Sequence, residues 1–405
     1  MHRLLPCHPG PKPDELLTSW IARVSYANGM TPTLFIASIS EASGWMTDYD
    51  CSPSQQLNAA LSARTGVHRE EIESLTLASY EGVLFESRAF LGTLPSYILP
   101  LRLFRKADGC RLQYCPECIV PEPFYRRSWR LALNVLCTKH KRYLVDECTG
   151  CGAPITYLRA GTSEVRVGST LPLWCASCGC AYAAGSDHSS VDAPLAEAQM
   201  MVERALARGY ADLGRCQVHS LLFFMGVRHL LRVLASGNHG ASLREVIRNA
   251  NGLPNDEMGW RVGERFEFLK NTHRAGLLRL LVPLLRDWPR EFVRYCRAAR
   301  MPAEGLLHRY LTLQDVPYWC AREFGIYSAR PRYDPSVEEI KAMMRYVQSG
   351  KDSSAVQIVR RFLLRKRATA KYRDLRNLVM EKSSLVRLTQ VLAHRWAALE
   401  ASRAA

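Results

Sequence analysis

The sequence predicts a mainly α protein with a small cysteine-rich insert, an N-terminal helix-turn-helix and C-terminal helical domains. Three observations predict this class. Apolar residues recur at helical spacing over most of the 405 residues. Nine of the fourteen cysteines fall between Cys110 and Cys180. The net charge is +16, and most of the excess lies in the C-terminal third. A polyanionic partner, most often nucleic acid, suits such a charge, although a generally basic protein stays open.

Length and composition shifts divide the chain into four predicted domains. Residues 1–105 form an N-terminal helical and helix-turn-helix domain, and residues 106–185 the cysteine-rich region. Residues 190–302 form a helical domain, and residues 303–405 a basic C-terminal helical domain. Apolar residues make up 47% of the chain, which is enough to build several cores.

Residues 14–28 carry the first predicted helix, with Asp14 as its N-cap. One apolar stripe follows at helical spacing, and Asn28 with the glycine after it ends the helix. The stripe consists of Leu16, Leu17, Trp20, Ile21 and Val24. A second helix starts after Thr31, which caps it, with Pro32 in the first position.

Residues 52–77 predict two helices joined by a turn at Gly66. The second helix covers His68–Leu77. The core between the helices consists of Leu57, Leu61, Val67, Ile72 and Leu75. This pattern is typical of a helix-turn-helix, although an ordinary helical hairpin stays open. Because the second helix contains the acidic stretch HREEIES, a protein partner is as compatible with it as DNA.

Four pairs of metal-ligand type lie in the cysteine-rich region. A Cys-x-x-Cys turn lets both sulfurs reach one ion, and two such turns close a tetrahedral zinc site. Taken in chain order, the pairs predict two structural zinc ions in a zinc-ribbon- or zinc-finger-like insert. The first site is Cys115, Cys118, Cys137 and His140, and the second is Cys148, Cys151, Cys175 and Cys178.

Alternative roles for these cysteines are less favoured. An interleaved pairing of the four turns stays open. A histidine ligand and the lack of a ferredoxin-like run argue against an iron–sulfur cluster. Four protein ligands leave no open position for catalysis. Cys180 or Cys110 is an alternative ligand, because each lies within a few residues of a predicted pair.

Helices resume after the cysteine-rich region. Residues 195–209 and 218–235 are predicted helices, the second buried on most sides. Residues 265–299 predict two more, broken near Pro289. Further short helices are predicted from residue 305 to the end.

The basic charge gathers near the C-terminus. From Arg286 onward there are 24 Lys and Arg against 12 Asp and Glu. A cluster without acids predicts contacts to DNA phosphates, although a solvated or protein-binding face stays open. It consists of Arg360, Arg361, Arg365, Lys366, Arg367, Lys371 and Arg373. In a second cluster, Tyr125–Arg130, we expect the aromatic rings to pack and Arg126 and Arg127 to contact phosphate.

The sequence lacks the motifs that are typical of several nucleotide-binding and enzyme classes. The sequence has no phosphate-binding loop, dinucleotide fingerprint, nucleophile elbow or His-Glu-x-x-His. A nuclease site built from three carboxylates has no fixed spacing that could be recognised in a sequence, so the missing motifs do not exclude one. Because acidic residues are sparse beside the basic ones, we nevertheless expect no enzyme. The N-terminus lacks the apolar region of a signal peptide, and the longest apolar run, Leu221–Val227, ends at Arg228. We therefore expect a cytoplasmic, nucleoid-associated protein without a membrane span, in which clustered cysteines favour metal over disulfides.

Three segments together resemble the TniQ family of transposition proteins. The first is PDELLTSWIARVSYANGM, which begins at Pro13. The second is CPEC, followed by YRRSW, CTKH and LVDECTGC. The third is LLRDWPREF at Leu284–Phe292. The resemblance is strong over residues 1–180, fair to about residue 300 and weak beyond. The length suggests a member from a Tni-type bacterial transposon, related to TnsD.

The resemblance implies a non-enzymatic accessory factor for target-site selection. Family members link target DNA, or a complex that recognises it, to an AAA+ regulator ATPase of the TniB or TnsC kind. That ATPase recruits the transposase, so the transposase is an indirect partner. A homodimer stays open. The family also uses its Cys and His positions to bind zinc, which carries over to the eight residues named above, less firmly for the second site.

Two other hypotheses belong to different classes. One is a stand-alone, sequence-specific DNA-binding regulator, which would bind its site tightly without a partner. The other is a nuclease or recombinase, which would cleave strands in the presence of a metal. We expect the adaptor in preference to both.

Overall fold

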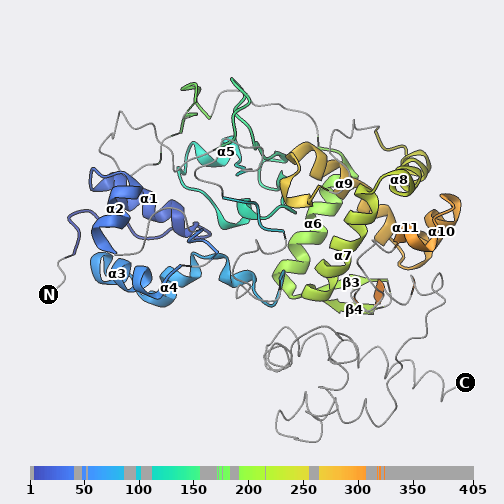
Figure 1. Cartoon of the computed structure of the whole chain (residues 1–405), viewed down its shortest axis with the longest axis horizontal. Coiled ribbons are helices and arrows are strands. Elements are labelled where there is room, and N and C mark those ends of the chain that lie inside the picture. The colour runs from blue at the N-terminus through green and yellow to red at the C-terminus, as the bar shows by residue number, and fades with distance from the viewer. Residues whose placement is uncertain are drawn as a thin grey trace, which may run out of the picture. The chain divides into compact units, whose positions relative to one another are not determined.

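The computed structural model describes residues 4–40, 48–51, 53–85, 97–101, 112–155, 171, 173–175, 177–182, 191–214, 216–254, 264–306, 317, 319–320 and 323. These residues are mainly helical with little sheet, which confirms the predicted fold class (Figure 1). The chain divides into two compact units. Unit 1 is Met1–Glu81, Arg88–Val202 and Asp256–Arg279, and unit 2 is Gly82–Ser87, Glu203–Asn255 and Leu280–Ala405. The four domain boundaries stay a prediction.

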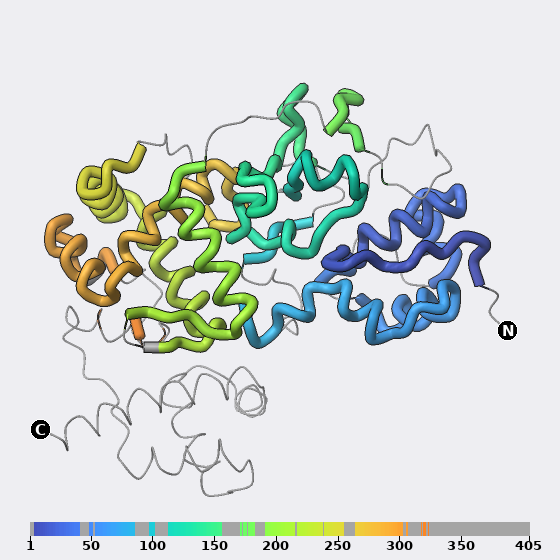
Figure 2. Tube along the Cα trace, turned by 180° about the vertical axis from the view of Figure 1, so that it is seen from behind, coloured from blue at the N-terminus to red at the C-terminus, as the bar shows by residue number. Residues whose placement is uncertain are grey.

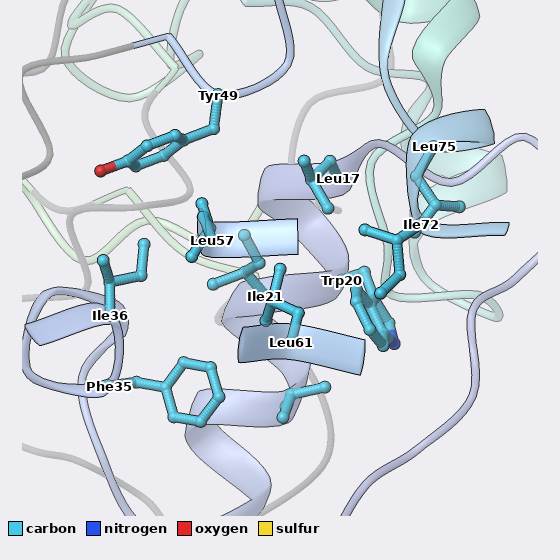
Figure 3. Close-up of a cluster of buried hydrophobic side chains, with 11 residues drawn as sticks. Leu17, Trp20, Ile21, Phe35, Ile36, Tyr49, Leu57, Leu61, Ile72 and Leu75 are labelled. Carbon is cyan, nitrogen blue, oxygen red and sulfur yellow. The ribbon is translucent and has the colours of Figure 1, made fainter. Parts of the chain in front are cut away.

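Unit 1 begins with four helices that share one apolar core. They are α1 (Leu17–Ala27), α2 (Pro32–Ile39), α3 (Gln55–Thr65) and α4 (Arg69–Ser74). Figures 1 and 2 both show them gathered into one group. Side chains of all four helices meet in the core (Figure 3). Its members are Leu17, Trp20, Ile21, Val24, Phe35, Ile36, Tyr49, Leu57, Leu61, Ile72 and Leu75.

The start of α1 differs from the prediction. Asp14 does not cap the helix; its backbone is left-handed, with φ 60°, and its carboxylate accepts a hydrogen bond from Ser128 Oγ at 2.7 Å. The helix begins at Leu17, and a distant residue takes over the cap. Asp50 accepts from the Thr18 N–H and from its hydroxyl, both at 2.8 Å. Tertiary contacts therefore satisfy donors that a local cap would otherwise bind.

The helix-turn-helix prediction fits α3 and α4. Gly66 ends α3 with φ 75°, a left-handed conformation that glycine adopts without strain. The second helix is shorter than the predicted His68–Leu77, and the 3₁₀ turn η1 (Leu77–Tyr80) follows it. The cap of α2 is as predicted, since Thr31 accepts from Leu34 N and Pro32 occupies the first position.

The cysteine-rich part of unit 1 has little regular structure. It contains α5 (Pro116–Ile119), the 3₁₀ turn η2 (Arg127–Arg130), β1 (Leu136–Cys137) and β2 (Arg142–Tyr143). The strands pair antiparallel, Leu136 with Tyr143 and Cys137 with Arg142. Isolated bridges tie the other segments together. Secondary structure alone cannot provide hydrogen-bond partners for all the backbone N–H and C=O groups of this region, so these groups depend on side chains.

Helices α6 (Ala193–Arg208) and α9 (Asn271–Leu285) contribute residues to both units, and the 3₁₀ turn η3 (Phe266–Phe268) precedes α9 in unit 1. Unit 2 contains the hairpin β3 (Tyr210–Leu213)–β4 (Cys216–His219), α7 (Ser220–Ala235), α8 (Asn238–Asn251), α10 (Arg290–Ala298) and α11 (Ala303–Leu306). The predicted helices 195–209 and 218–235 correspond to α6 and α7, and the predicted break near Pro289 separates α9 from α10. The hairpin and α8 were not predicted.

Among the described residues, no helix taken singly is long and apolar enough for a membrane span; only α7 and α8 together reach that size, across a bend of 98°.

Candidate metal centres

The first predicted set of ligands meets in the structure. Cys115 precedes α5 and Cys118 lies within it, while Cys137 ends β1 and His140 lies in the turn that leads to β2. Lys141, with φ 49°, completes the tight turn of this hairpin. The four ligand atoms lie within 4.8 Å of one another. We call this set the first cluster.

Distances within the first cluster match a tetrahedral zinc site. The Sγ atoms of Cys118 and Cys137 are 3.7 Å apart. His140 Nδ1 lies 3.2 Å from the Cys118 sulfur and 3.4 Å from that of Cys115. Zinc–sulfur bonds of about 2.3 Å give a tetrahedral edge of about 3.8 Å between sulfurs, and the shorter bond to nitrogen gives a shorter edge. These separations therefore suit four ligands around one ion.

The second cluster is built from two copies of one turn. In each copy a glycine follows the second cysteine, Gly152 with φ 68° and Gly179 with φ 73°. Each glycine donates its N–H to the carbonyl of the first cysteine, Cys148 at 2.8 Å and Cys175 at 2.9 Å. A left-handed residue is needed to close this turn, and glycine supplies it without a steric penalty. The left-handed backbone conformation of this turn therefore explains why a glycine follows each Cys-x-x-Cys pair.

The second cluster also has tetrahedral dimensions. Cys148 and Cys178 have their sulfurs 3.6 Å apart, and Cys151 and Cys175 have theirs 3.8 Å apart. All four sulfurs lie within 4.8 Å of one another. Both close pairs join a cysteine of one turn to a cysteine of the other, as one shared ion requires.

Hydrogen bonds prepare one sulfur in each cluster as a thiolate. A bond from the Cys115 thiol lowers the pKa of Cys137 to about 5. Burial acts to raise the pKa of Cys148, but hydrogen bonds from the backbone of Gly150 and Cys151 and from the thiols of Cys178 and Cys175 together lower that pKa to about 7. Zinc binds thiolate and not thiol, so both clusters carry a sulfur that is already favourable for metal.

The donor sets fit zinc. Three thiolates with one imidazole, and four thiolates, are typical structural zinc ligands, and each set fills the coordination sphere. The structure therefore contains two groups suited to holding a metal, in agreement with the predicted cofactor.

The alternative ligands have different positions. Cys180 lies beside the second cluster, where a Cβ on Gly150 would come within 3.3 Å of the Cys180 sulfur. It is Cys178, however, whose sulfur lies among the other three. Cys110 lies outside the described residues, as do Arg360 to Arg373, so the predicted phosphate contacts of that basic cluster stay a prediction.

The basic stretch Tyr125–Arg130 is bonded within unit 1. Arg126 pairs with Glu122, and Arg127 pairs with Asp14. Arg130 is fully buried and bonds Asp48 at 2.6 Å and Asp50 at 2.8 Å. The rings of Tyr125 and Trp129 are buried and pack edge to face, as predicted. This stretch thus joins the first cluster to the helices α1–α4.

Sequence reasoning missed four buried polar side chains that support the first cluster. They bind the irregular backbone between η2 and β1, which secondary structure leaves unpaired. Arg274 donates to Ala132 O at 2.8 Å, and Asn271 donates to Val135 O at 3.0 Å. Gln113 donates to Asn134 O at 2.6 Å, and Gln199 accepts from Val135 N at 3.0 Å. No local spacing marks these residues.

The structure thus defines a mainly helical protein with a helix-turn-helix-like N-terminal part and two Cys/His clusters that could hold metal ions. Residues 6–144 match the family model described as TniQ, which supports the resemblance to TniQ-family transposition proteins that the motifs predict. The family consists of non-catalytic accessory proteins of transposition. The matched segment ends just after the first cluster and before the second. No curated protein matches the chain.

Proposed function

We propose that the protein is a non-enzymatic adaptor for target selection in DNA transposition. It links target DNA, or a complex that recognises the target, to an AAA+ regulator ATPase and so to the transposase, in the bacterial cytoplasm. The observation that carries this proposal is the TniQ match over residues 6–144. That segment contains α1–α4 and the first cluster, which the buried Arg130 joins into one structure.

The proposal assigns two structural zinc ions to the clusters. Cys115, Cys118, Cys137 and His140 hold one, and Cys148, Cys151, Cys175 and Cys178 hold the other. Bound zinc supplies folding free energy to a region whose regular structure is sparse. Its role is to fix the shape of a binding surface, because neither cluster has an open coordination position.

A stand-alone DNA-binding regulator is the second candidate, since α3, Gly66 and α4 have helix-turn-helix order. The exposed side of α4 disfavours it. Glu70, Glu71 and Glu73 are all exposed there, and carboxylates repel DNA phosphates. A second helix of this charge fits a protein partner better than a DNA groove.

The test compares the two candidates directly. Binding of the full chain to target and random DNA is measured at two salt concentrations, with and without the ATPase of the same element. The adaptor predicts tight, selective retention only when the ATPase is present. Selective binding at about 10⁻⁸ M or tighter by the protein alone would replace the adaptor with the regulator.

A further inference from the structure

Helix α10 of unit 2 has two contrasting faces. Phe292, Tyr295 and Cys296 are buried, with at most 2% of each exposed. Arg290 and Arg297 are exposed on the other side. Arg294 is also exposed, so the helical arginines recur at i, i+4 and i+7 and lie along one side. Arg286 before the helix and Arg300 after it are exposed as well. We call these five residues the α10 arginine face.

Acidic residues neutralise this face only in part. Between Arg286 and Arg300 there are five arginines, no lysine and two acids. Glu291 is engaged by Arg294, which lowers the pKa of Glu291. Asp287 lies 3.7 Å from Arg290, and both are well exposed, so this pair contributes little. Within the described part of the chain, Arg297 and Arg300 have no ion-pair partner.

Arg300 occupies a position that favours glycine. Its φ is 49°, and it follows the C-cap of α10. Arg300 N donates to Arg297 O at 3.0 Å, and Met301 N donates to Cys296 O at 2.9 Å. This is the arrangement in which glycine usually ends a helix, because a side chain in the left-handed region is strained. The side chain of Arg300 is exposed at this point, so its guanidinium can reach a phosphate.

We propose that the α10 arginine face binds the sugar–phosphate backbone of duplex DNA without regard to sequence. Arg290 and Arg297 are about 10 Å apart along the helix axis. One DNA strand presents about three phosphates over that length. Guanidinium groups form two parallel hydrogen bonds to a phosphate, which lysine does not. This proposal rests on the DNA association in the proposed function, and it names the α10 arginine face as the surface that contacts the DNA.

An acidic protein surface is the competing occupant, and the composition of the face argues against it. Protein interfaces usually contain exposed aromatic or large apolar anchors among their charges. The large apolar residues that are exposed in the described part of the chain all lie elsewhere, and none falls between Arg286 and Arg300. A face whose cations are all guanidinium groups, and which lacks an exposed apolar anchor, suits phosphates.

The experiment measures binding of the full chain to a 40-base-pair duplex of mixed sequence, by fluorescence anisotropy between 50 and 200 mM KCl. The test variant is Arg290→Gln with Arg297→Gln, which leaves the Arg294–Glu291 pair intact. The matched control is Arg204→Gln with Arg208→Gln, which removes two exposed charges from α6. We expect the test variant to lower the slope of log K against log salt by about 1.8 and to weaken binding about tenfold or more at 100 mM salt. We expect the control to keep the slope.

Arg300→Gly separates binding from folding. It removes a cation and relieves the left-handed strain, so we expect weaker DNA binding together with an unchanged or higher melting temperature. Wild-type affinity and slope in both α10 variants would overturn this proposal alone. No DNA binding by the wild type, with or without the ATPase, would overturn the proposed DNA association as well. Loss of ATPase binding with intact DNA binding would assign the face to protein and also overturn the proposal.

Discussion

The first cluster is enclosed by unit 1, whereas the second lies at the surface of that unit. Cys115, Cys118 and Cys137 are each less than 9% exposed. In the second cluster Cys151 and Cys178 are exposed. Each cluster offers four protein ligands, so the number of ligands does not set how far the fold depends on each metal. Their surroundings do.

The chain segments that flank the two clusters also differ in how they are bonded to the rest of unit 1. The backbone that enters the first cluster is bonded to buried side chains of α6 and α9, and Arg130 connects it to Asp48 and Asp50. The second cluster is closed by the short bridges Glu147 with Pro154 and Trp174 with Ala181, and fewer contacts join it to the rest of unit 1, among them the Tyr114 hydroxyl, which donates to Tyr182 O at 3.0 Å. We therefore expect loss of the first metal to unfold unit 1, and loss of the second to loosen only its own surroundings.

The largest expected effect comes from Cys137→Ser. Structural zinc sites contribute about 10–16 kcal/mol in zinc-finger peptides, as much as the whole stability of a typical domain, about 5–15 kcal/mol. We expect unit 1 to lose its cooperative thermal transition and the chain to keep at most one zinc. Metal analysis and circular dichroism measure both, with Cys7→Ser, at an exposed cysteine, as control. Two zinc ions and an unchanged melt in Cys137→Ser would refute the assignment.

Arg130→Met tests the connection between the first cluster and α1. It leaves the buried Asp50 without its guanidinium partner, and breaking a buried pair costs about 3–5 kcal/mol. Urea unfolding measures the change. The matched control is Arg126→Met, whose partner Glu122 is half exposed and whose pair contributes about 0–1 kcal/mol. Equal losses in the two variants would show that Arg130 does not join the two parts.

A smaller loss is expected from Cys175→Ser. The variant should release one zinc and keep the cooperative transition of unit 1, with a loss of about 0.5–3 kcal/mol, as for ordinary substitutions. Metal analysis and limited proteolysis, followed by mapping of the cleavage sites, measure this. If unit 1 unfolds as it does in Cys137→Ser, the contrast between the two clusters is wrong.

The sequence was sufficient for features that depend on near neighbours. Ligand pairs two residues apart, glycine turns and the apolar stripe of α1 are local, so spacing alone predicts them. The partners of Arg130 are about 80 residues away, and Asn271 binds a backbone carbonyl 136 residues away. Such pairings depend on which segments the fold brings together. For the same reason Asp14 was a reasonable local cap, yet Asp50 caps the helix from a distance.

As the pH is lowered, the two clusters should release zinc at different pH values. Protons compete with zinc for thiolates, so zinc affinity falls as the pH falls. Cys137, with a pKa of about 5, stays a thiolate at neutral pH, whereas Cys148, with a pKa of about 7, is already partly protonated there. We expect the second cluster to release zinc at the higher pH. Zinc release into a chromophoric chelator is compared between the wild type and Cys175→Ser, which keeps only the first cluster's ion, so the step missing from the variant belongs to the second cluster. The reverse order of release would contradict the prediction.

The smallest effect is expected from Cys180→Ser, which decides the fourth ligand of the second cluster. Cys180 lies against Gly150, but the sulfur of Cys178 is 3.6 Å from that of Cys148, the edge expected when both bind one ion. Serine at position 180 should therefore leave two zinc ions per chain and the melting curve unchanged, while Cys178→Ser should lose one ion. Competition with a chelator measures the affinity that remains. If Cys180→Ser loses the ion and Cys178→Ser retains it, the second cluster closes through Cys180, the residue next to the bridge at Ala181, and its metal is tied more closely to the fold than its exposure suggests.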